Sequence, residues 1–557
     1  MKFSSLSNLS FQLRITLAWL VLFLLALLSR SFVPIDETRY VTVAWNMYQS
    51  GQYVVPYLND VAYSHKPPLL FWLINLGWHL FGVSDWWARM VPAIFGLGAM
   101  LLTHSIGQRL WPQTKIGEHA AWILLSTSLW AVFSTATMFD MMVALFTSLG
   151  VFAMLLALQG AGRRAWGIFC LAVAGGLLAK GPTILLQLLP LAILMPWVMR
   201  QAWPYSSTRQ WYGALFLSTM GGILLLLLWA IPAGILGGAQ YQHEIFWGQT
   251  AERMVNSFAH QRPIYWYAMM APVILFPWFW LAQSWRAWGL AWRDHQHSSV
   301  RFCLAWALPV LLAFSLISGK QMHYLLPILP AFALLLAYGW QHRSLPSVNP
   351  RWSYNGLALS VLLLLAGVAL FNIAGISAQH RLPAWVLAIQ PWVACSLILL
   401  AVWYQWPNPL RPKDLFVRSC LLGILLFVIG MIGIVRATGE AYDMRGVAQY
   451  LAKLEQSGVA LGNVGDYHGQ YNFIGRLKRS PEQLTEERVQ AWFAQYPQGR
   501  VVVYLDKFDL GDIQPEYHQL YRGISLAVMD AQQWQTWLAQ RAARRHAKQQ
   551  HKDSDAE

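Results

Sequence analysis

Long apolar stretches recur along most of this chain, and they constrain its fold more than any other feature. Two examples are ITLAWLVLFLLALL (15–28) and GGILLLLLWAIPAGIL (221–236). With its flanking residues, each is long enough to cross the roughly 30 Å hydrocarbon core of a bilayer as a helix. Only 12% of the residues are charged, about half the share found in a typical soluble domain. The sequence therefore predicts a polytopic α-helical membrane protein.

Thirteen segments are candidate membrane spans. The first has Lys2 and Arg14 before it and no small-residue cleavage site after it, so we expect an anchor rather than a cleaved signal peptide. A further apolar segment, 69–82, is short for a span and is predicted to lie in the membrane interface. The candidate spans are residues 12–30, 86–110, 118–136, 139–159, 165–179, 181–199, 211–236, 265–290, 301–318, 322–340, 355–376, 383–404 and 415–435.

The distribution of lysine and arginine predicts how these spans are oriented. With a cytoplasmic N-terminus, the basic residues are in excess in the cytoplasmic loops, as the positive-inside rule expects. An odd number of spans then places the C-terminal residues in the periplasm. The net charge of +15 comes from residues spread over many loops, which favours membrane topology over nucleic-acid binding as its explanation.

The composition changes near residue 436. The segments 459–465, 500–506 and 521–530 are typical of strands, and 442–456 and 481–496 are typical of helices. Alternating elements of this kind predict a small α/β domain. We therefore expect a transmembrane domain over residues 1–435, followed by a periplasmic α/β domain with a charged tail over residues 436–557.

Acidic and basic residues occur together on the predicted outer side. The loop 31–85 holds PIDETRY (34–40) and YSHKPPLLFW (63–72), and long ordered loops are often functional. Ionisable groups also stand at span ends in TATMFDMMVALF (135–146), LLAKGPTILL (177–186) and LISGKQMHYLLPILP (316–330), and in the connecting segment 243–267. The candidate site residues are Asp36, Glu37, Arg39, His65, Lys66, Asp140, Lys180, Glu244, Arg253, Lys320, His323 and Tyr324.

Each of these groups also has a structural interpretation. An ionisable group at membrane depth costs about 2.5–3.5 kcal/mol, so it needs a partner or a water-filled cavity. Asp140 and Lys180 would meet this need as an ion pair between two spans. Asp36 could cap a helix that starts at Glu37, and Lys66 could extend to lipid head groups. Contact with lipid phosphates or a structural role is the alternative for Arg253, His260, Lys320 and His323.

The residue types at this surface suit one kind of chemistry. A carboxylate can accept a proton from an attacking hydroxyl or orient a nucleophile. Lysine and arginine can neutralise a phosphate leaving group and the charge that grows on it. Apolar grooves between spans can hold a lipid tail. Together these features favour group transfer from a lipid phosphate donor.

The motifs also resemble those of a known family. PIDETRY, GQYVVP (51–56) and YSHKPP (63–68) resemble the first outer loop of bacterial lipid-linked-sugar glycosyltransferases of the aminoarabinose transferase (ArnT-like) type, which are related to protein O-mannosyltransferases. The later segments agree in order, and the resemblance covers nearly the whole chain. These segments are the span mouth at Asp140, LAKGP (178–182), RPIYWY (262–267) and GKQMHYLLPILP (319–330).

The resemblance implies a GT-C fold with about 13 transmembrane helices and a small C-terminal periplasmic α/β domain. It also implies a polyprenyl (undecaprenyl) phosphate sugar donor, inversion at the anomeric carbon, and an active site at the periplasmic face of the inner membrane. By position in the motifs, Asp36 matches the essential loop aspartate, Lys66 the lysine of the K-P motif, and Asp140 a second carboxylate near the cavity. Lys320 and Tyr324 fall where family members contact the donor phosphate.

The expected activity is transfer of a sugar, with 4-amino-4-deoxy-L-arabinose as one candidate, to lipid A or another envelope glycolipid. His65 stands where aminoarabinose transferases usually have a glutamate, so other sugars and acceptors stay open. The alternatives are transfer of a hexose or uronic acid to lipopolysaccharide core or another envelope glycan, and protein O-glycosylation. A transporter is the non-enzyme alternative, although the chain lacks the repeated halves typical of transporters. No cofactor is expected, and a divalent metal ion is left open.

Overall fold

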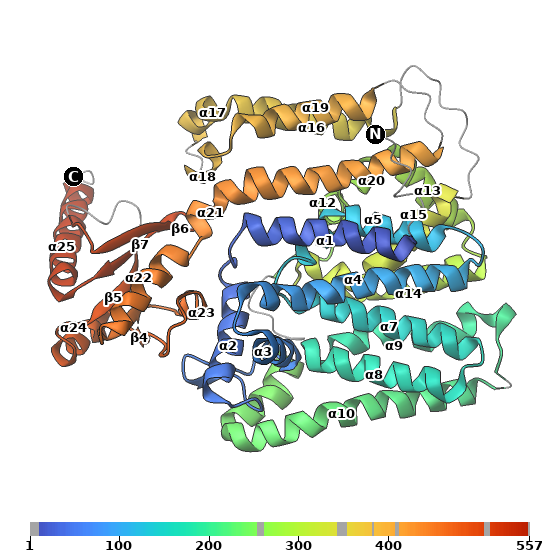
Figure 1. Ribbon diagram of the computed structural model, residues 1–557, viewed down its shortest axis with the longest axis horizontal. Helices are drawn as coiled ribbons and strands as arrows, with labels where there is room; N and C mark the ends of the chain where they lie inside the picture. The colour runs from blue at the N-terminus through green and yellow to red at the C-terminus, as the bar shows by residue number, and fades with distance from the viewer. Residues whose placement is uncertain are drawn as a thin grey trace.

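The apolar segments fold into long helices that lie side by side in one bundle (Figure 1). The computed structural model describes residues 10–205, 207–252, 261–341, 354–380, 384–406, 412–505 and 513–554. The longest helices of the bundle are α1 (Phe11–Ser29), α4 (Asp85–Leu110), α7 (Asp140–Leu158), α8 (Gly162–Lys180), α10 (Thr208–His243), α14 (Ser298–Leu316) and α20 (Pro412–Ile429).

Seven helical segments in the described part of the chain are long and apolar enough to cross a membrane. The predicted multi-pass membrane protein is thus confirmed, whereas the count of thirteen spans stays a prediction. The seven are Phe11–Ser29, Asp85–Leu110, Asp140–Leu158, Thr208–Gly248, Ser298–Leu316, Met322–Gln341 and Lys413–Gly439. Four shorter apolar helices are α3 (Leu69–Phe81), α9 (Thr183–Val198), α16 (Leu357–Phe371) and α19 (Pro391–Gln405).

Several predicted spans are interrupted in the structure, and two of them, 118–136 and 265–290, bear on the site. The segment 118–136 is split into α5 (Ile116–Ser126) and α6 (Ser128–Phe133), and 265–290 is split into α12 (Trp266–Ile274), a short 3-10 turn and α13 (Ala282–Arg293). The two breaks meet, because the backbone N–H of Ser128 donates to the carbonyl of Phe276 at 2.9 Å. Interrupted backbone is tolerated at membrane depth where neighbouring protein satisfies its polar groups. Each of these two candidate spans is therefore an interrupted helix.

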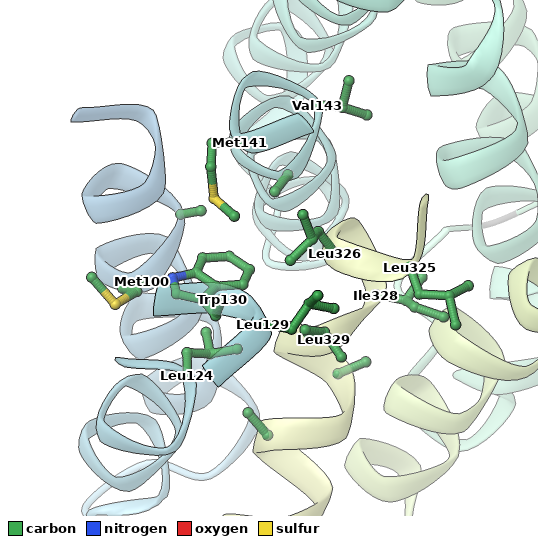
Figure 2. Packing of buried hydrophobic residues seen from close by; sticks show 14 of the residues in the cluster. Met100, Leu124, Leu129, Trp130, Met141, Val143, Leu325, Leu326, Ile328 and Leu329 are labelled. Atoms are coloured by element: carbon green, nitrogen blue, oxygen red, sulfur yellow. The ribbon is translucent and has the colours of Figure 1, made fainter. Parts of the chain in front are cut away.

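An apolar core supports the polar end of α7. Trp130 of α6 is fully buried, and Met100 of α4 and Met141 of α7 lie beside it (Figure 2). Met141 directly follows Asp140, so this packing holds the first turn of α7 in place. Close packing of α4 against α5 adds to it, since a Cβ on Gly117 would lie only 2.3 Å from the carbonyl oxygen of His104.

The outer loop is well structured and carries the helix α2 (Asp36–Ser50), the short hairpin β1 (Tyr57–Leu58) and β2 (Val61–Ala62), and then α3. Two acidic residues open α2, where the positive end of the helix dipole favours negative charge. The helix ends at Gly51, whose φ of 68° suits a residue without a Cβ. The N-cap position is Ile35 and no side-chain cap forms, so the interpretation of Asp36 as a capping residue is wrong.

The C-terminal residues form a five-stranded mixed sheet that lies at the same end of the bundle as α2 (Figure 1). Its strand order is β4-β3-β5-β7-β6. The strands β4, β3 and β5 run parallel to one another, and β7 runs antiparallel to both of its neighbours, β5 and β6. The strands are β3 (Leu461–Val464), β4 (Glu482–Leu484), β5 (Arg500–Leu505), β6 (Tyr517–Tyr521) and β7 (Ile524–Met529). The accompanying helices are α22 (Arg445–Gln456), α24 (Glu486–Gln495) and α25 (Ala531–Ser554).

Sequence patterns located most of these C-terminal elements but missed β4 and β6. The predicted helix 481–496 starts too early, because residues 482–484 form β4 and α24 begins only at Glu486. The predicted strand 521–530 starts too early, because a turn with Arg522 and Gly523 at positive φ separates β6 from β7. The helix α20 also continues through a π-helical segment into α21 (Arg436–Tyr442). The backbone therefore stays helical past residue 436, where the composition changes.

Candidate active site

Asp36 is the first residue of α2 and is the most accessible acid of the predicted site. Its side chain is 50% exposed and forms an ion pair with Arg39, one turn further along the helix. The hydroxyl of Tyr40 lies 3.5 Å from the same carboxylate oxygen, Oδ1. The Arg39 guanidinium also lies over the Tyr40 ring, 5.4 Å from its centroid. An exposed carboxylate with an adjacent cation can accept a proton or orient a polar nucleophile.

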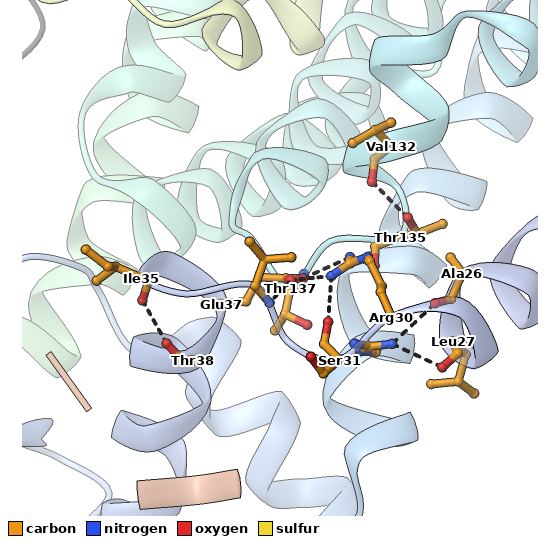
Figure 3. A network of polar contacts seen from close by, with 12 residues as sticks. Ala26, Leu27, Arg30, Ser31, Ile35, Glu37, Thr38, Val132, Thr135 and Thr137 are labelled. Atoms are coloured by element: carbon orange, nitrogen blue, oxygen red, sulfur yellow. Dashed lines mark hydrogen bonds and ion pairs between the residues drawn. The ribbon is translucent and has the colours of Figure 1, made fainter. Parts of the chain in front are cut away.

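Glu37 points into the protein rather than towards the accessible side of Asp36. Its carboxylate pairs with Arg30 through two hydrogen bonds, one of 3.1 Å, and accepts backbone N–H groups from Val33 at 2.8 Å and Thr137 at 2.6 Å (Figure 3). Arg30 also donates to the carbonyl of Thr135 at 2.9 Å. This network ties the end of α1, the start of α2 and the segment before α7 together.

The charge of Glu37 is stabilised despite its burial. Only 4% of the residue is exposed, and burial disfavours a carboxylate. The Arg30 guanidinium and the backbone donors outweigh that cost and hold the pKa of Glu37 below its usual value. The predicted contact of Glu37 with substrate is untested, and its observed contacts are structural.

Asp140 and Lys180 form a second charged group where α7 starts and α8 ends. The Lys180 ammonium lies 2.6 Å from Asp140 Oδ1, and His323 Nε2 lies 4.0 Å from the same oxygen. Lys180 also lies 4.6 Å from the centroid of the Tyr324 ring. The predicted ion pair between two spans is therefore present, and two residues of the GKQMHY segment complete its surroundings.

The two charged groups are neighbours. The Tyr40 ring on α2 contacts the Phe139 ring, at the N-cap of α7, with centroids 4.9 Å apart. Lys66 lies within electrostatic reach of Asp140, and His323 lies within reach of both Asp36 and Asp140. The fold thus brings the PIDETRY and YSHKPP segments together with the mouths of three later helical segments.

The other candidate residues differ in their burial and in the contacts that they make. Ser64, two residues before Lys66, donates a hydrogen bond to Glu244, which joins the YSHKPP segment to the end of α10. Lys320 is 3% exposed, and its ammonium donates to the backbone carbonyls of Arg262 at 2.9 Å and Ile317 at 2.5 Å. The His65 ring contacts the Tyr63 ring at 5.2 Å. Arg253 and His260 lie outside the described residues.

Comparison with known proteins decides the family. The family model described as Dolichyl-phosphate-mannose-protein mannosyltransferase matches residues 65–218. The undecaprenyl phosphate-alpha-4-amino-4-deoxy-L-arabinose arabinosyl transferase of Pectobacterium carotovorum subsp. carotovorum is 30% identical to this chain over 430 residues, and the match covers 74% of each protein. The chain belongs to this arabinosyl transferase family.

Other members and solved structures agree. The arabinosyl transferase of the same name from Pseudomonas aeruginosa is 28% identical over 475 residues, covering 81% of both chains. ArnT from Cupriavidus metallidurans in the apo state matches with a TM-score of 0.73 at 18% identity, covering 93% of this chain and 97% of that one. Its complex with undecaprenyl phosphate gives 0.71 at 19% identity. The predicted ArnT-like family and GT-C fold class are thus confirmed.

Some residues that support the site are not apparent from the sequence. Arg30 follows the first apolar segment as an ordinary flanking basic residue, and nothing in its position in the sequence indicates the contact with Glu37. The backbone of Thr137 was also missed, because a backbone donor has no residue signature.

No metal site is apparent in the part of the transferase that the structure describes. Within the ranges given above, no group of three or more His, Cys, Asp or Glu side chains is arranged to hold a metal ion. Asp36 and Asp140 are instead each paired with a cationic side chain. The arrangement therefore offers protein cations for stabilising a phosphate.

Replacing Lys180 of the transferase by methionine is expected to lower the rate of sugar transfer by roughly 100-fold or more. The substitution leaves the buried Asp140 without its counter-charge and removes a positive group from the site; loss of one preorganised charge-stabilising group typically costs about 10²–10³ in rate. The rate should be measured on purified protein. Lys180→Arg keeps the charge and should retain more activity, and equal losses in both variants would contradict the charge argument.

Proposed function

We propose that this protein transfers 4-amino-4-deoxy-L-arabinose from an undecaprenyl phosphate donor to lipid A or a related envelope glycolipid. The sugar and the donor are those in the names of its family members, and undecaprenyl phosphate is the lipid bound in the structure of ArnT from Cupriavidus metallidurans. The reaction takes place at the periplasmic face of the inner membrane, with the N-terminus in the cytoplasm and the C-terminal domain in the periplasm. The excess of basic residues in the cytoplasmic loops supports this orientation.

One observation carries the assignment of roles. The half-exposed carboxylate of Asp36 lies near a group of lysines and acids, in which the buried Asp140 is already paired with the partly buried Lys180. Such a fixed cationic group can stabilise a phosphate without reorganising during the reaction. The accessible carboxylate is then the group that meets the acceptor.

In the proposed reaction, an acceptor oxygen attacks the anomeric carbon of the donor sugar and forms a new C–O bond. The bond from that carbon to the phosphate oxygen breaks, and undecaprenyl phosphate leaves with the electron pair. Lys66 and Lys180 neutralise the charge on the leaving phosphate. An acceptor hydroxyl passes its proton to Asp36. A phosphate oxygen of lipid A has no proton to lose, and Asp36 and Arg39 then orient the acceptor.

Mass spectrometry of lipid A and envelope glycans tests this proposal in cells with the gene intact or deleted. We expect the deletion to remove one 4-amino-4-deoxypentose from lipid A and the intact gene to restore it. Loss of a hexose or uronic acid from lipopolysaccharide core would replace our sugar and acceptor by the alternative. An unchanged set of glycolipids and glycans in a strain that makes the donor would contradict the enzymatic proposal.

A further inference from the structure

The C-terminal domain contacts the helix that carries Asp36. Thr42 on α2 donates to the carbonyl of Gly469 at 2.8 Å and accepts the N–H of Phe473 at 3.4 Å. One turn further along α2, the Trp45 indole N–H donates to the carbonyl of Leu477 at 2.9 Å. These bonds attach one edge of the C-terminal domain directly to α2.

The same stretch of the domain is held from a second side by the outer loop. Asn59, in the turn of the β1–β2 hairpin, donates to the carbonyl of Tyr467 at 2.6 Å. A Cβ on Gly469 would lie 2.8 Å from Thr42 Cγ2 and 3.1 Å from Leu58 Cδ1, and the φ of Gly469 is 72°. Glycine is therefore needed here for both space and backbone conformation. Residues 467–469 are clamped between α2 and the hairpin.

The clamp positions His468 next to the accessible side of the site. Asp36, Arg39 and Thr42 are spaced by three residues, so they follow one face of α2. Gly469 sits on Thr42, and the neighbouring His468 lies within electrostatic reach of Arg39 and Asp36. The residue is half-buried, and in the described part of the chain only its backbone N–H makes a hydrogen bond, to Gln470 at 2.8 Å. Its imidazole is thus available to a ligand.

The state of this imidazole suits recognition of a polar head group. Burial and the nearby Arg39 guanidinium lower the pKa of His468 below its usual value, which favours the neutral ring. A neutral imidazole offers one hydrogen-bond donor and one acceptor. With Arg39 beside it, the pair can bind sugar hydroxyls together with a phosphate.

We propose that His468 is an acceptor-binding residue, and that residues 466–470 form the wall of the site that faces the phosphorylated sugar head group of the acceptor. This inference rests on the proposed function. The donor phosphate is assigned to Lys66 and Lys180, whereas His468 approaches the site from the C-terminal domain, within electrostatic reach of Asp36. Catalysis would then require a complete C-terminal domain seated on α2.

Steady-state kinetics on full-length purified protein test the inference, with undecaprenyl phosphate-linked aminoarabinose as donor and purified lipid A as acceptor. We expect His468→Ala to raise the KM for lipid A roughly tenfold, the scale of one lost hydrogen bond to a charged group. The KM for the donor and kcat should stay close to wild type. His468→Gln keeps one donor and one acceptor and should recover part of the loss. His518→Ala is the matched control, because His518 is an exposed histidine on β6 of the same domain.

Each contrary result has a distinct meaning. An unchanged KM for lipid A in His468→Ala, with active wild type, would overturn the role of His468 and leave the proposed function intact. A fall in kcat and in the thermal unfolding midpoint without a change in that KM would also overturn it, since it would indicate a purely structural role. A wild-type protein that makes no product from these substrates would overturn the proposed function and this inference with it.

Discussion

Replacing Asp36 by asparagine is expected to abolish sugar transfer while leaving the yield of folded protein unchanged. The side chain is half exposed, and its main contacts are Arg39 and Tyr40 on the same helix, so its amide analogue fits without repacking. Asparagine cannot accept the proton of an acceptor hydroxyl, and loss of a general base typically costs about 10²–10⁴ in rate. If the acceptor is a phosphate, the variant instead loses the ion pair that holds Arg39 in position.

The measurement is the rate of product formation by purified protein, together with glycolipid mass spectrometry of cells that express the variant. Asp60→Asn is the matched control. Asp60 is an exposed acid in the same outer loop with a φ of 62°, and asparagine tolerates that conformation well. Normal activity in Asp36→Asn would refute the assigned role. Equal losses in both variants would show that the loop responds to any change of charge.

The second large effect is expected at Glu37, where Glu37→Gln should destabilise the protein and disable the site. The substitution leaves the guanidinium of Arg30 buried without a counter-charge, and breaking a buried pair in this way typically costs about 3–5 kcal/mol. The network joins α1, α2 and the segment before α7, so its loss should also displace Asp36. We expect a lower thermal unfolding midpoint in detergent and a lower yield.

A double variant separates charge burial from shape. Arg30→Met combined with Glu37→Gln removes both charges and keeps an amide oxygen that can accept a backbone N–H from Val33 or Thr137. It should unfold at a higher temperature than Glu37→Gln alone. Replacing both charged partners costs far less stability than leaving one charge buried without its partner. A double variant less stable than the single one would contradict the ion-pair explanation.

The same pair predicts a pH dependence. The pKa of Glu37 in the folded protein lies below its unfolded value of 4.5, so the unfolded state binds the proton more readily. Its contribution to stability is complete above about pH 4.5 and is lost as the pH falls through the folded pKa. As the pH falls below this value, the thermal unfolding midpoint of the wild type should therefore decrease more steeply than the midpoint of the double variant. Parallel curves would exclude Glu37 as the source.

The sequence alone predicts an interaction where a residue's type and setting require a partner. Asp140 and Lys180 could be paired from sequence because an isolated charge at a span end requires a partner. Asp36 stood out because it follows a span directly. The burial of Glu37 could not be foreseen, since adjacent residues on a helix point in different directions and only the fold decides which one meets Arg30.

Longer-range features left no pattern to detect. The breaks at Ser128 and Phe276 lie inside apolar runs that look like ordinary spans, and a backbone hydrogen bond joins the two breaks. Hydropathy depends only on the composition of each segment, so it cannot indicate a hydrogen bond between two segments. The position of His468 depends on Gly469 seated on Thr42, a contact between segments at opposite ends of the chain.

The meeting of the two broken helices also has a consequence for biosynthesis. While the ribosome has made only the first part of the chain, Ser128 has no carbonyl of Phe276 to receive its N–H. An unsatisfied backbone group exposed to lipid costs several kcal/mol, so the segment around α6 would be held in water or by the insertion machinery until α12 has been translated. Fragments that stop before Phe276 should therefore be degraded, whereas a split pair of fragments expressed together could assemble. The membrane domain would then be completed as a unit late in translation rather than span by span.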